Sequence, residues 1–203
     1  MAGWWKRLFG KSSSSSTRCY PPGCTKEQIA RIDAQFDDFD RQRREAEAEL
    51  RANPYHPDPG DNPGIEAALR AAPPEAWQRL WSAVDEVLSA APESQGTWRF
   101  KNRDGSLSMP HVDYSDAIYR MNKALYDVDA IVSFSWTKWN IRSIYPGGHG
   151  LDTAPVADAA RVLTAVVNAE RFSDGTILAA LSDGLLPSAL QRLRSWYEQQ
   201  TRP

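Results

Sequence analysis

Only a few residues in the sequence combine a reactive side chain with a spacing that chemistry could use. His111 and Asp113 are two positions apart, so on a β-strand they would share one face. There the pair would suit acid–base chemistry or contact with a metal ion. The alternative is that both are ordinary surface residues, as isolated pairs of this kind usually are, and we prefer that interpretation.

A second group of candidates combines aromatic rings with charge. Trp136 and Trp139 could line an aromatic pocket. The guanidinium of Arg171, close to Asp174, could hold a carboxylate or phosphate through two parallel hydrogen bonds. The alternative places both tryptophans in the core, lets Arg171 and Asp174 cap helix ends, and makes Phe172 a core anchor.

Together these side chains define one hypothetical ligand pocket, which requires the fold to bring distant positions together. Its members are His111, Asp113, Trp136, Trp139, Arg171 and Asp174. No Gly-x-Ser-x-Gly motif of the kind that presents a nucleophilic serine accompanies them. We therefore predict no catalytic residue and no cofactor, and favour a protein that is not an enzyme.

The cysteines and the glycine-rich stretch offer little further chemistry. Cys19 and Cys24 flank a Pro-Pro-Gly bend, and a zinc site would need two more thiolates or imidazoles nearby. We predict two plain thiols and no metal, and the alternative is a labile disulfide across the bend. The stretch 147–150 is rich in glycine but lacks the Lys-Ser/Thr of a phosphate-binding loop, so we interpret it as a flexible connection.

Charge is distributed unevenly along the chain. The net charge is −2, but residues 1–26 contain five cations and no acid, which leaves −7 on the remainder. The final helix offers Arg192 and Arg194 as candidate DNA contacts, but Glu198 opposes them and the acidic body would repel DNA. We therefore regard nucleic-acid binding as the weaker hypothesis.

The N-terminal residues 1–24 read as a disordered basic and aromatic tail, with a serine linker at 12–16. A short helical turn within residues 1–11 would be apolar on one side and basic on the other, which suits the boundary of an anionic membrane. The alternative is a tail whose tryptophans dock on protein. The contact residues predicted for a membrane or a partner are Trp4, Trp5, Lys6, Arg7, Leu8 and Phe9.

A long polar helix is predicted at 25–52. Thr25 and Gln28 have the spacing of a capping box. The apolar positions that follow form a narrow stripe, which favours a surface helix and leaves open a homodimer through this helix. These positions are Ile29, Ile32, Phe36, Phe39, Ala46 and Leu50. Residues 53–64, with four prolines, are predicted to be a linker.

Residues 65–203 are predicted to form the helical globular domain. The fold class is mainly α (α+β): a compact multi-helix domain with one small β-hairpin, preceded by the long N-terminal helix and the disordered basic tail. Periods of 3.6 residues predict helices, and alternation around Asp104-Gly105 predicts the hairpin. The predicted helices are 65–72, 75–91, 115–127, 154–170, a short one after Asp174, and 186–199, and the hairpin is 97–109.

Several boundaries follow from local signals. Pro110 is expected to end the second strand of the hairpin, and Ser115 to begin the next helix. Asp152 or Thr153 is expected to cap the helix at 154–170, and Asp174 the short helix after it. The stretch 130–141 fits a strand and a helix equally well.

Several motifs of the C-terminal half occur in the order of a known family. They are Trp136-Thr-Lys-Trp139, Leu163-Thr-Ala-Val-Val, Arg171-Phe172, Gly175, Gly184 and Leu190-Gln-Arg-Leu-Arg194. In these the chain resembles a bacterial family catalogued as domain of unknown function 6508, over roughly 97–197. The resemblance implies a bacterial, mainly helical domain and implies no activity.

The function that this pattern favours is an interaction or adaptor protein tethered to a membrane surface or an assembly by its tail. No stretch approaches the ~20 apolar residues of a membrane-spanning helix, and residues 1–11 lack the apolar core of a secretory signal. We therefore expect a cytoplasmic protein, peripheral at the inner membrane face if the tail binds lipid.

Overall fold

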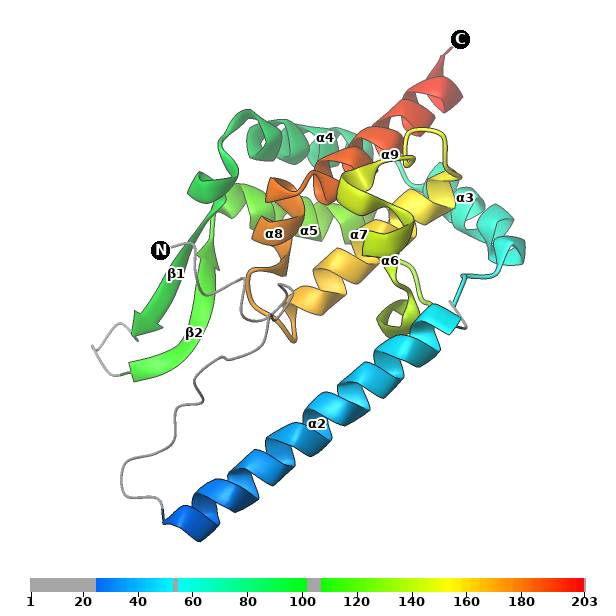
Figure 1. Cartoon of the computed structure of the whole chain (residues 1–203). Helices are drawn as coiled ribbons and strands as arrows, with labels where there is room; N and C mark the ends of the chain where they lie inside the picture. Colours follow the sequence, from blue (N-terminus) through cyan, green and yellow to red (C-terminus); the bar gives the residue numbers. More distant parts are fainter. Residues whose placement is uncertain (1–24, 53–54, 102–106, 203) are drawn as a thin grey trace. The chain divides into compact units, whose positions relative to one another are not determined.

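The computed structural model describes residues 25–52, 55–101 and 107–202, and it divides into two units at Ala52 (Figure 1). The first unit contributes one helix, and the second is the helical domain. The tail residues that carry the predicted membrane or partner contacts, both cysteines and the Asp104-Gly105 turn lie outside the described residues.

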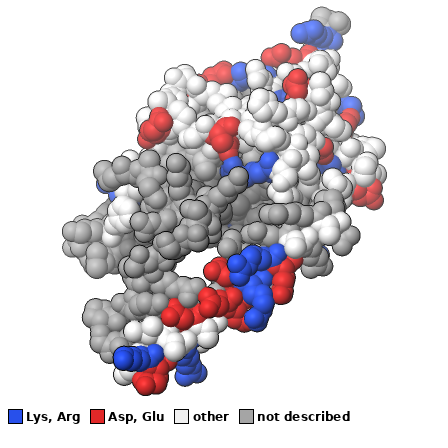
Figure 2. Space-filling view, viewed as in Figure 1, with Lys and Arg blue, Asp and Glu red and all other residues white. Residues whose placement is uncertain are grey.

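Helix α2 (Lys26–Ala52) is the long polar helix. The predicted capping box is confirmed, because the Thr25 N–H donates to Gln28 Oε1 at 2.8 Å and the Gln28 N–H donates to Thr25 Oγ1 at 3.2 Å. Of the predicted apolar stripe, only Ile29 has a described side chain. Arginines and acids follow one another along this helix (Figure 2).

The helical domain is mostly α, and its described residues form one antiparallel hairpin, as predicted. Its elements in chain order are α3 (Asn62–Ala71), α4 (Pro74–Ser89), β1 (Gly96–Lys101), β2 (Leu107–Tyr114), α5 (Asp116–Asp127), α6 (Ile141–Ile144), α7 (Val156–Glu170), α8 (Thr176–Ser182) and α9 (Leu185–Thr201). Short 3-10 turns η1 (Pro59–Asp61), η2 (Pro92–Gln95), η3 (Trp136–Lys138) and η4 (Pro146–Gly148) join them.

Helix α7 is the central element of the domain. Its residues from Val156 to Val167 are buried on nearly every side, Asp158 excepted, which is the pattern of a helix surrounded by other elements. It packs against α3, α8 and α9, while α4 packs against α5 and α9 (Figure 1). The core therefore lies between α7 and the helices that follow and precede it.

An aromatic cluster joins α4 to α9. The Trp77 ring stacks on Trp81 with 5.4 Å between centroids and on Tyr197 with 4.6 Å, and Trp196 lies 6.3 Å away. Trp77 is buried and Trp81 packs against the core. The guanidinium of Arg194 covers the Trp81 ring at 4.8 Å and closes the cluster toward solvent.

One arginine lies inside the domain. Arg161 of α7 is only 2% exposed, and its Nη1 donates to Asp158 Oδ1 at 2.9 Å and to Asn62 Oδ1 at 2.7 Å. Its Nη2 donates to the Asp58 carbonyl at 3.1 Å, and the Tyr145 hydroxyl donates to Asp158 Oδ2 at 2.6 Å. The network connects the segment before α3, the segment before η4, and α7.

The prediction that Pro110 ends the second strand is wrong, because β2 continues to Tyr114. Arg99 pairs with His111 and Lys101 with Leu107, so β2 has extra residues between these pairs. Pro110 lies in this bulged stretch, where a residue without an N–H disturbs the ladder least.

Within the helical domain, the predicted N-cap residue is correct for α5 and wrong for α7 and α8. The Ser115 side chain accepts from the Ile118 N–H and caps α5, as predicted. Neither Asp152 nor Thr153 caps α7, because Pro155 occupies the N-cap position. Asp174 does not cap α8, because its N-cap is Gly175 and the carboxylate of Glu170 bonds the first N–H groups instead.

The stretch 130–141 is neither of the two structures that its pattern allowed. It is irregular until the 3-10 turn η3, and α6 begins at Ile141. No described helix is both long enough and apolar enough to cross a membrane.

Candidate functional site

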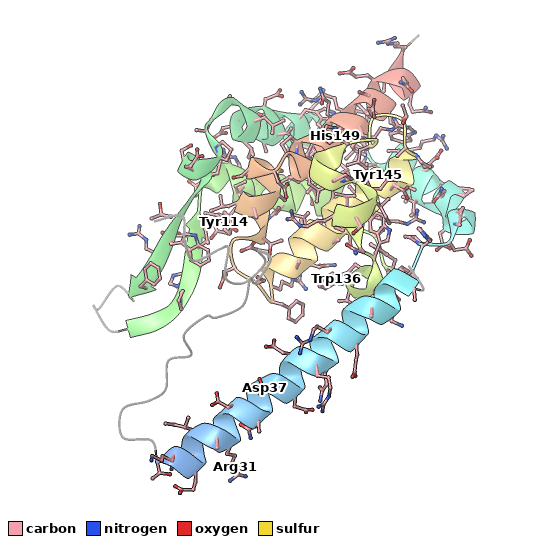
Figure 3. All side chains as sticks on the ribbon, in the orientation of Figure 1. Arg31, Asp37, Tyr114, Trp136, Tyr145 and His149 are labelled. Atoms are coloured by element: carbon pink, nitrogen blue, oxygen red, sulfur yellow. The ribbon has the colours of Figure 1, made fainter. Side chains whose placement is uncertain are left out.

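The turn between α7 and α8 carries Phe172, which is the most exposed of the large apolar side chains in the described part of the chain. Phe172 is 80% exposed and its ring lies 6.1 Å from that of Trp136, with 30° between the planes. Trp136 is half-buried on η3, which packs against α7. Figure 3 labels Trp136 on this segment between α5 and α6. The prediction that Phe172 anchors the core is therefore wrong.

The backbone explains why Phe172 points outward. The N–H groups of Phe172 and Ser173 both donate to the Ala169 carbonyl, at 3.0 and 2.9 Å, so the chain makes a tight turn after α7. Gly175 then has φ of 85°, a left-handed conformation that glycine adopts without steric cost. The turn carries Phe172 past the last buried residues of the helix and into solvent.

The carboxylate of Glu170 holds this turn in place through hydrogen bonds. Its carboxylate accepts from the Gly175 N–H at 2.8 Å and from the Ile177 N–H at 2.9 Å, so it bonds both the end of the turn and the start of α8. The Tyr114 hydroxyl is buried beside this carboxylate without a hydrogen bond of good geometry. Burial raises the pKa of Glu170, against the effect of its hydrogen bonds, and burial beside Glu170 raises the pKa of Tyr114.

Each ring has a cation close to it in the chain, Arg171 next to Phe172 and Lys138 on the same 3-10 turn as Trp136. Arg171 and Lys138 are both exposed, and no ion pair joins either of them to a carboxylate of the described residues. Asp174 lies on the same turn and is exposed, and its charge adds to the raised pKa values of Glu170 and Tyr114. We call the surface formed by Trp136, Lys138, Arg171 and Phe172 the aromatic turn.

The six residues of the hypothetical pocket are distributed over three places. Arg171 and Asp174 lie on the turn and Trp136 lies beside it. Trp139 is 5% exposed in the core, where its ring meets Phe134 at 5.6 Å and Tyr145 at 6.2 Å.

The remaining two members, His111 and Asp113, are exposed on β2. Asp113 pairs with Arg99 of β1 at 3.5 Å, and His111 lies opposite the same arginine in the register. A cavity of about 480 Å³ lies elsewhere and is lined by none of the six residues. Within the described part of the chain, no group of three or more His, Cys, Asp or Glu residues could hold a metal ion.

A model of a family of unknown function, DUF6508, matches residues 72–199. The chain belongs to the DUF6508 family. The match begins earlier than the resemblance seen in the sequence and therefore includes α4, so the aromatic cluster between α4 and α9 lies wholly within the family domain. No curated protein and no solved structure matches the chain. The turn between α7 and α8 is also part of the DUF6508 domain, whereas α2 lies before it.

Sequence reasoning missed Glu170, Tyr114 and the residues around the cavity. Glu170 acts on N–H groups five and seven positions later, and no helix-capping rule predicts that distance. The three glycines of 147–150 were a signal for the cavity. Because this stretch lacks a phosphate-loop motif, it was interpreted as a flexible connection.

The raised pKa of Glu170 makes the stability of the DUF6508 domain depend on pH. The folded state holds this proton at pH values where the unfolded chain has lost it, so the wild type should lose stability as pH rises. The window opens near the ordinary pKa of 4.5 and closes at the raised folded pKa. Glu170→Gln removes the titration, so its free energy of unfolding should fall less over this window in urea titrations at a series of pH values.

The matched control for that series is Glu93→Gln, an exposed glutamate of η2 in the same domain. Its curve should run parallel to that of the wild type. A Glu170→Gln curve that also runs parallel to the wild type would contradict the assignment.

Proposed function

We propose that this protein is a non-enzymatic interaction protein and that its DUF6508 domain binds a protein partner through the aromatic turn. The observation that carries the proposal is the exposure of Phe172 beside Trp136. An exposed phenylalanine is costly in water, because its ring leaves a large apolar area unburied. A partner that covers the ring would recover that free energy.

The geometry favours a partner with a pocket. Phe172 protrudes from a turn and Trp136 supports its ring from one side, so the pair resembles the aromatic anchors that dominate the energy of many interfaces. Glu170 holds the turn in place through its hydrogen bonds, which lowers the entropy lost on binding. We infer that Phe172 enters an apolar pocket of the partner.

The positive charge of the aromatic turn indicates which kind of residue surrounds the pocket of the partner. Lys138 and Arg171 are exposed, lie close to the two rings in the chain and have no carboxylate partner among the described residues. Complementary charge across an interface speeds association and selects partners. We therefore infer that acidic residues surround the pocket of the partner.

Phe172→Ala should abolish capture of the partner without affecting the fold. A photo-crosslinking amino acid placed at Ser173, next to the ring, should give discrete adducts in lysate of the native host. The Phe172→Ala version of the same probe should lose them, because truncating an aromatic anchor costs an interface about 2–4 kcal/mol. Thermal unfolding should change little, since the ring is mostly exposed.

The matched control is Phe100→Ala, because Phe100 is a second exposed phenylalanine of the domain, at 58%. The adducts should persist in this variant, and a purified adduct protein should bind the wild-type chain and not Phe172→Ala. Equal loss in both variants, or adducts that do not depend on Phe172, would contradict the proposal.

The segments before the domain contribute a tether in the same proposal. Residues 1–11 would hold the protein at a membrane surface or an assembly, in a bacterial cytoplasm, and α2 could pair with a second copy. In the same lysate experiment, a variant lacking residues 1–16 should keep the adducts at Ser173 but leave the membrane fraction. An unchanged distribution would refute the tether, and light scattering at two concentrations tests the dimer.

A further inference from the structure

The cavity of about 480 Å³ lies between the glycine-rich stretch and α9, away from the aromatic turn. Its walls come from two sources, η4 with the loop that follows it and one polar side of the final helix. The residues that line it are Gly147, Gly148, His149, Gly150, Asp152, Ser188, Gln191, Arg192 and Ser195. Figure 3 labels His149 and Tyr145 on the segment that supplies the loop.

The loop is a defined structure rather than the flexible connection that the sequence suggested. Gly147, Gly148 and Gly150 all have positive φ, at 61°, 83° and 87°. A Cβ atom on Gly148 would collide with the side chain of Ser188 and lie 2.9 Å from the Gly184 carbonyl. Glycine therefore allows the loop to lie directly on α9, and this close approach shapes one wall of the cavity.

Arg192 gives the cavity a positioned positive charge. Its Nε donates to the Ala154 carbonyl at 2.7 Å, which fixes the plane of the guanidinium. No carboxylate forms an ion pair with it among the described residues, whereas Arg194 on the same helix pairs with Asp85 at 2.7 Å. A guanidinium that is held by one nitrogen and keeps its other two for a ligand is a preorganised receptor for an oxyanion.

We infer that this cavity binds a small organic oxyanion, a phosphate ester or a carboxylate that also carries hydroxyl groups. Arg192 would pair with the anionic group. The hydroxyls of Ser188 and Ser195, the amide of Gln191 and the imidazole of His149 supply hydrogen bonds for the rest of the ligand. Asp152 at the same cavity can accept from a ligand hydroxyl and disfavours polyanions such as nucleic acids.

The hydrogen-bond network around Arg161 holds the start of the loop that forms one wall of this site. Tyr145 donates to Asp158 at 2.6 Å, and Tyr145 directly precedes the η4 turn that carries the glycines. The loop is therefore anchored to the central helix α7 at its start and rests on α9 through Gly148. A cavity whose two walls are both fixed loses little entropy when a ligand binds.

The test is a titration of the full-length protein with glycerol phosphate, glycerate and inorganic phosphate at constant ionic strength, followed by amide chemical shifts. Saturable shifts should cluster in residues 147–152 and 188–195. Glycerol phosphate and glycerate differ in the anionic group, so their relative affinities assign phosphate or carboxylate as the preferred class. Arg192→Gln should weaken binding of the better probe about tenfold or more.

Two further variants make the result decisive. Arg202→Gln removes the same charge at an exposed position outside the cavity and should bind as the wild type does. Ser195→Trp fills the cavity from an exposed position and should block binding with the fold intact. No saturable shift with any of the three probes, shifts that map elsewhere, or binding that survives both Arg192→Gln and Ser195→Trp would overturn the inference.

Discussion

Asp158→Ala should lower the free energy of unfolding of the helical domain by about 3–5 kcal/mol. Arg161 is 2% exposed, so its guanidinium cannot turn to water when its carboxylate partner is removed. Two neutral acceptors, Asn62 Oδ1 and the Asp58 carbonyl, would remain. The partly buried Tyr145 hydroxyl would lose its acceptor at the same time, which adds to the loss.

Urea denaturation monitored by tryptophan fluorescence measures this loss. The matched control is Asp113→Ala, which breaks the ion pair with Arg99 on the exposed hairpin and should cost at most about 1 kcal/mol. Comparable losses in the two variants would mean that the charge of Arg161 is solvated in the folded protein, contrary to its burial.

Gly148→Ala should destabilise the domain by about 2–4 kcal/mol, because it combines a strained positive φ with a steric clash. The clash is with the Ser188 side chain on α9, so relief requires the loop to separate from the helix. Gly64→Ala should have the opposite sign. Gly64 lies in the first turn of α3 with nothing within 4 Å of the added methyl group, and alanine is favoured over glycine in a helix by up to ~1 kcal/mol.

Because the two expected changes in stability have opposite signs, this pair of variants tests whether the loop packs on α9. Thermal unfolding should show a lower midpoint for Gly148→Ala and a midpoint that is equal or higher for Gly64→Ala. A small effect of Gly148→Ala would mean that the loop does not rest on α9 in solution, and it would also remove one wall of the proposed oxyanion site.

Local and periodic signals predicted much of the fold. Three of these signals involve only residues that are close in the chain: the apolar stripe of α4 with Trp77, the cap of α5 by Ser115 and the capping box of α2. Because no distant residue takes part in them, they can be predicted from the sequence. The start of α8 could not be predicted in this way. It is set by Glu170 of the preceding helix. The carboxylate of Glu170 can accept from the Ile177 N–H only after the turn between the two helices has formed.

The candidate site was predictable only in part, for a related reason. Arg171 and Asp174 were identified from their position at a helix junction and Trp136 from its type, whereas Phe172 was expected only as a core residue. Whether an aromatic side chain is buried depends on what the rest of the chain covers. The sequence therefore could not separate Trp139, which is in the core, from Phe172, which is in solvent.

The aromatic cluster between α4 and α9 has a consequence for synthesis of the protein. Trp77 and Tyr197 lie near opposite ends of the family domain, yet their rings stack at 4.6 Å. On the ribosome, the tryptophans of α4 emerge long before the helix that covers them. The domain can complete its core only after α9 has been synthesised, and a chain that stops short of α9 displays an uncovered tryptophan face, the kind of surface that chaperones and proteases recognise.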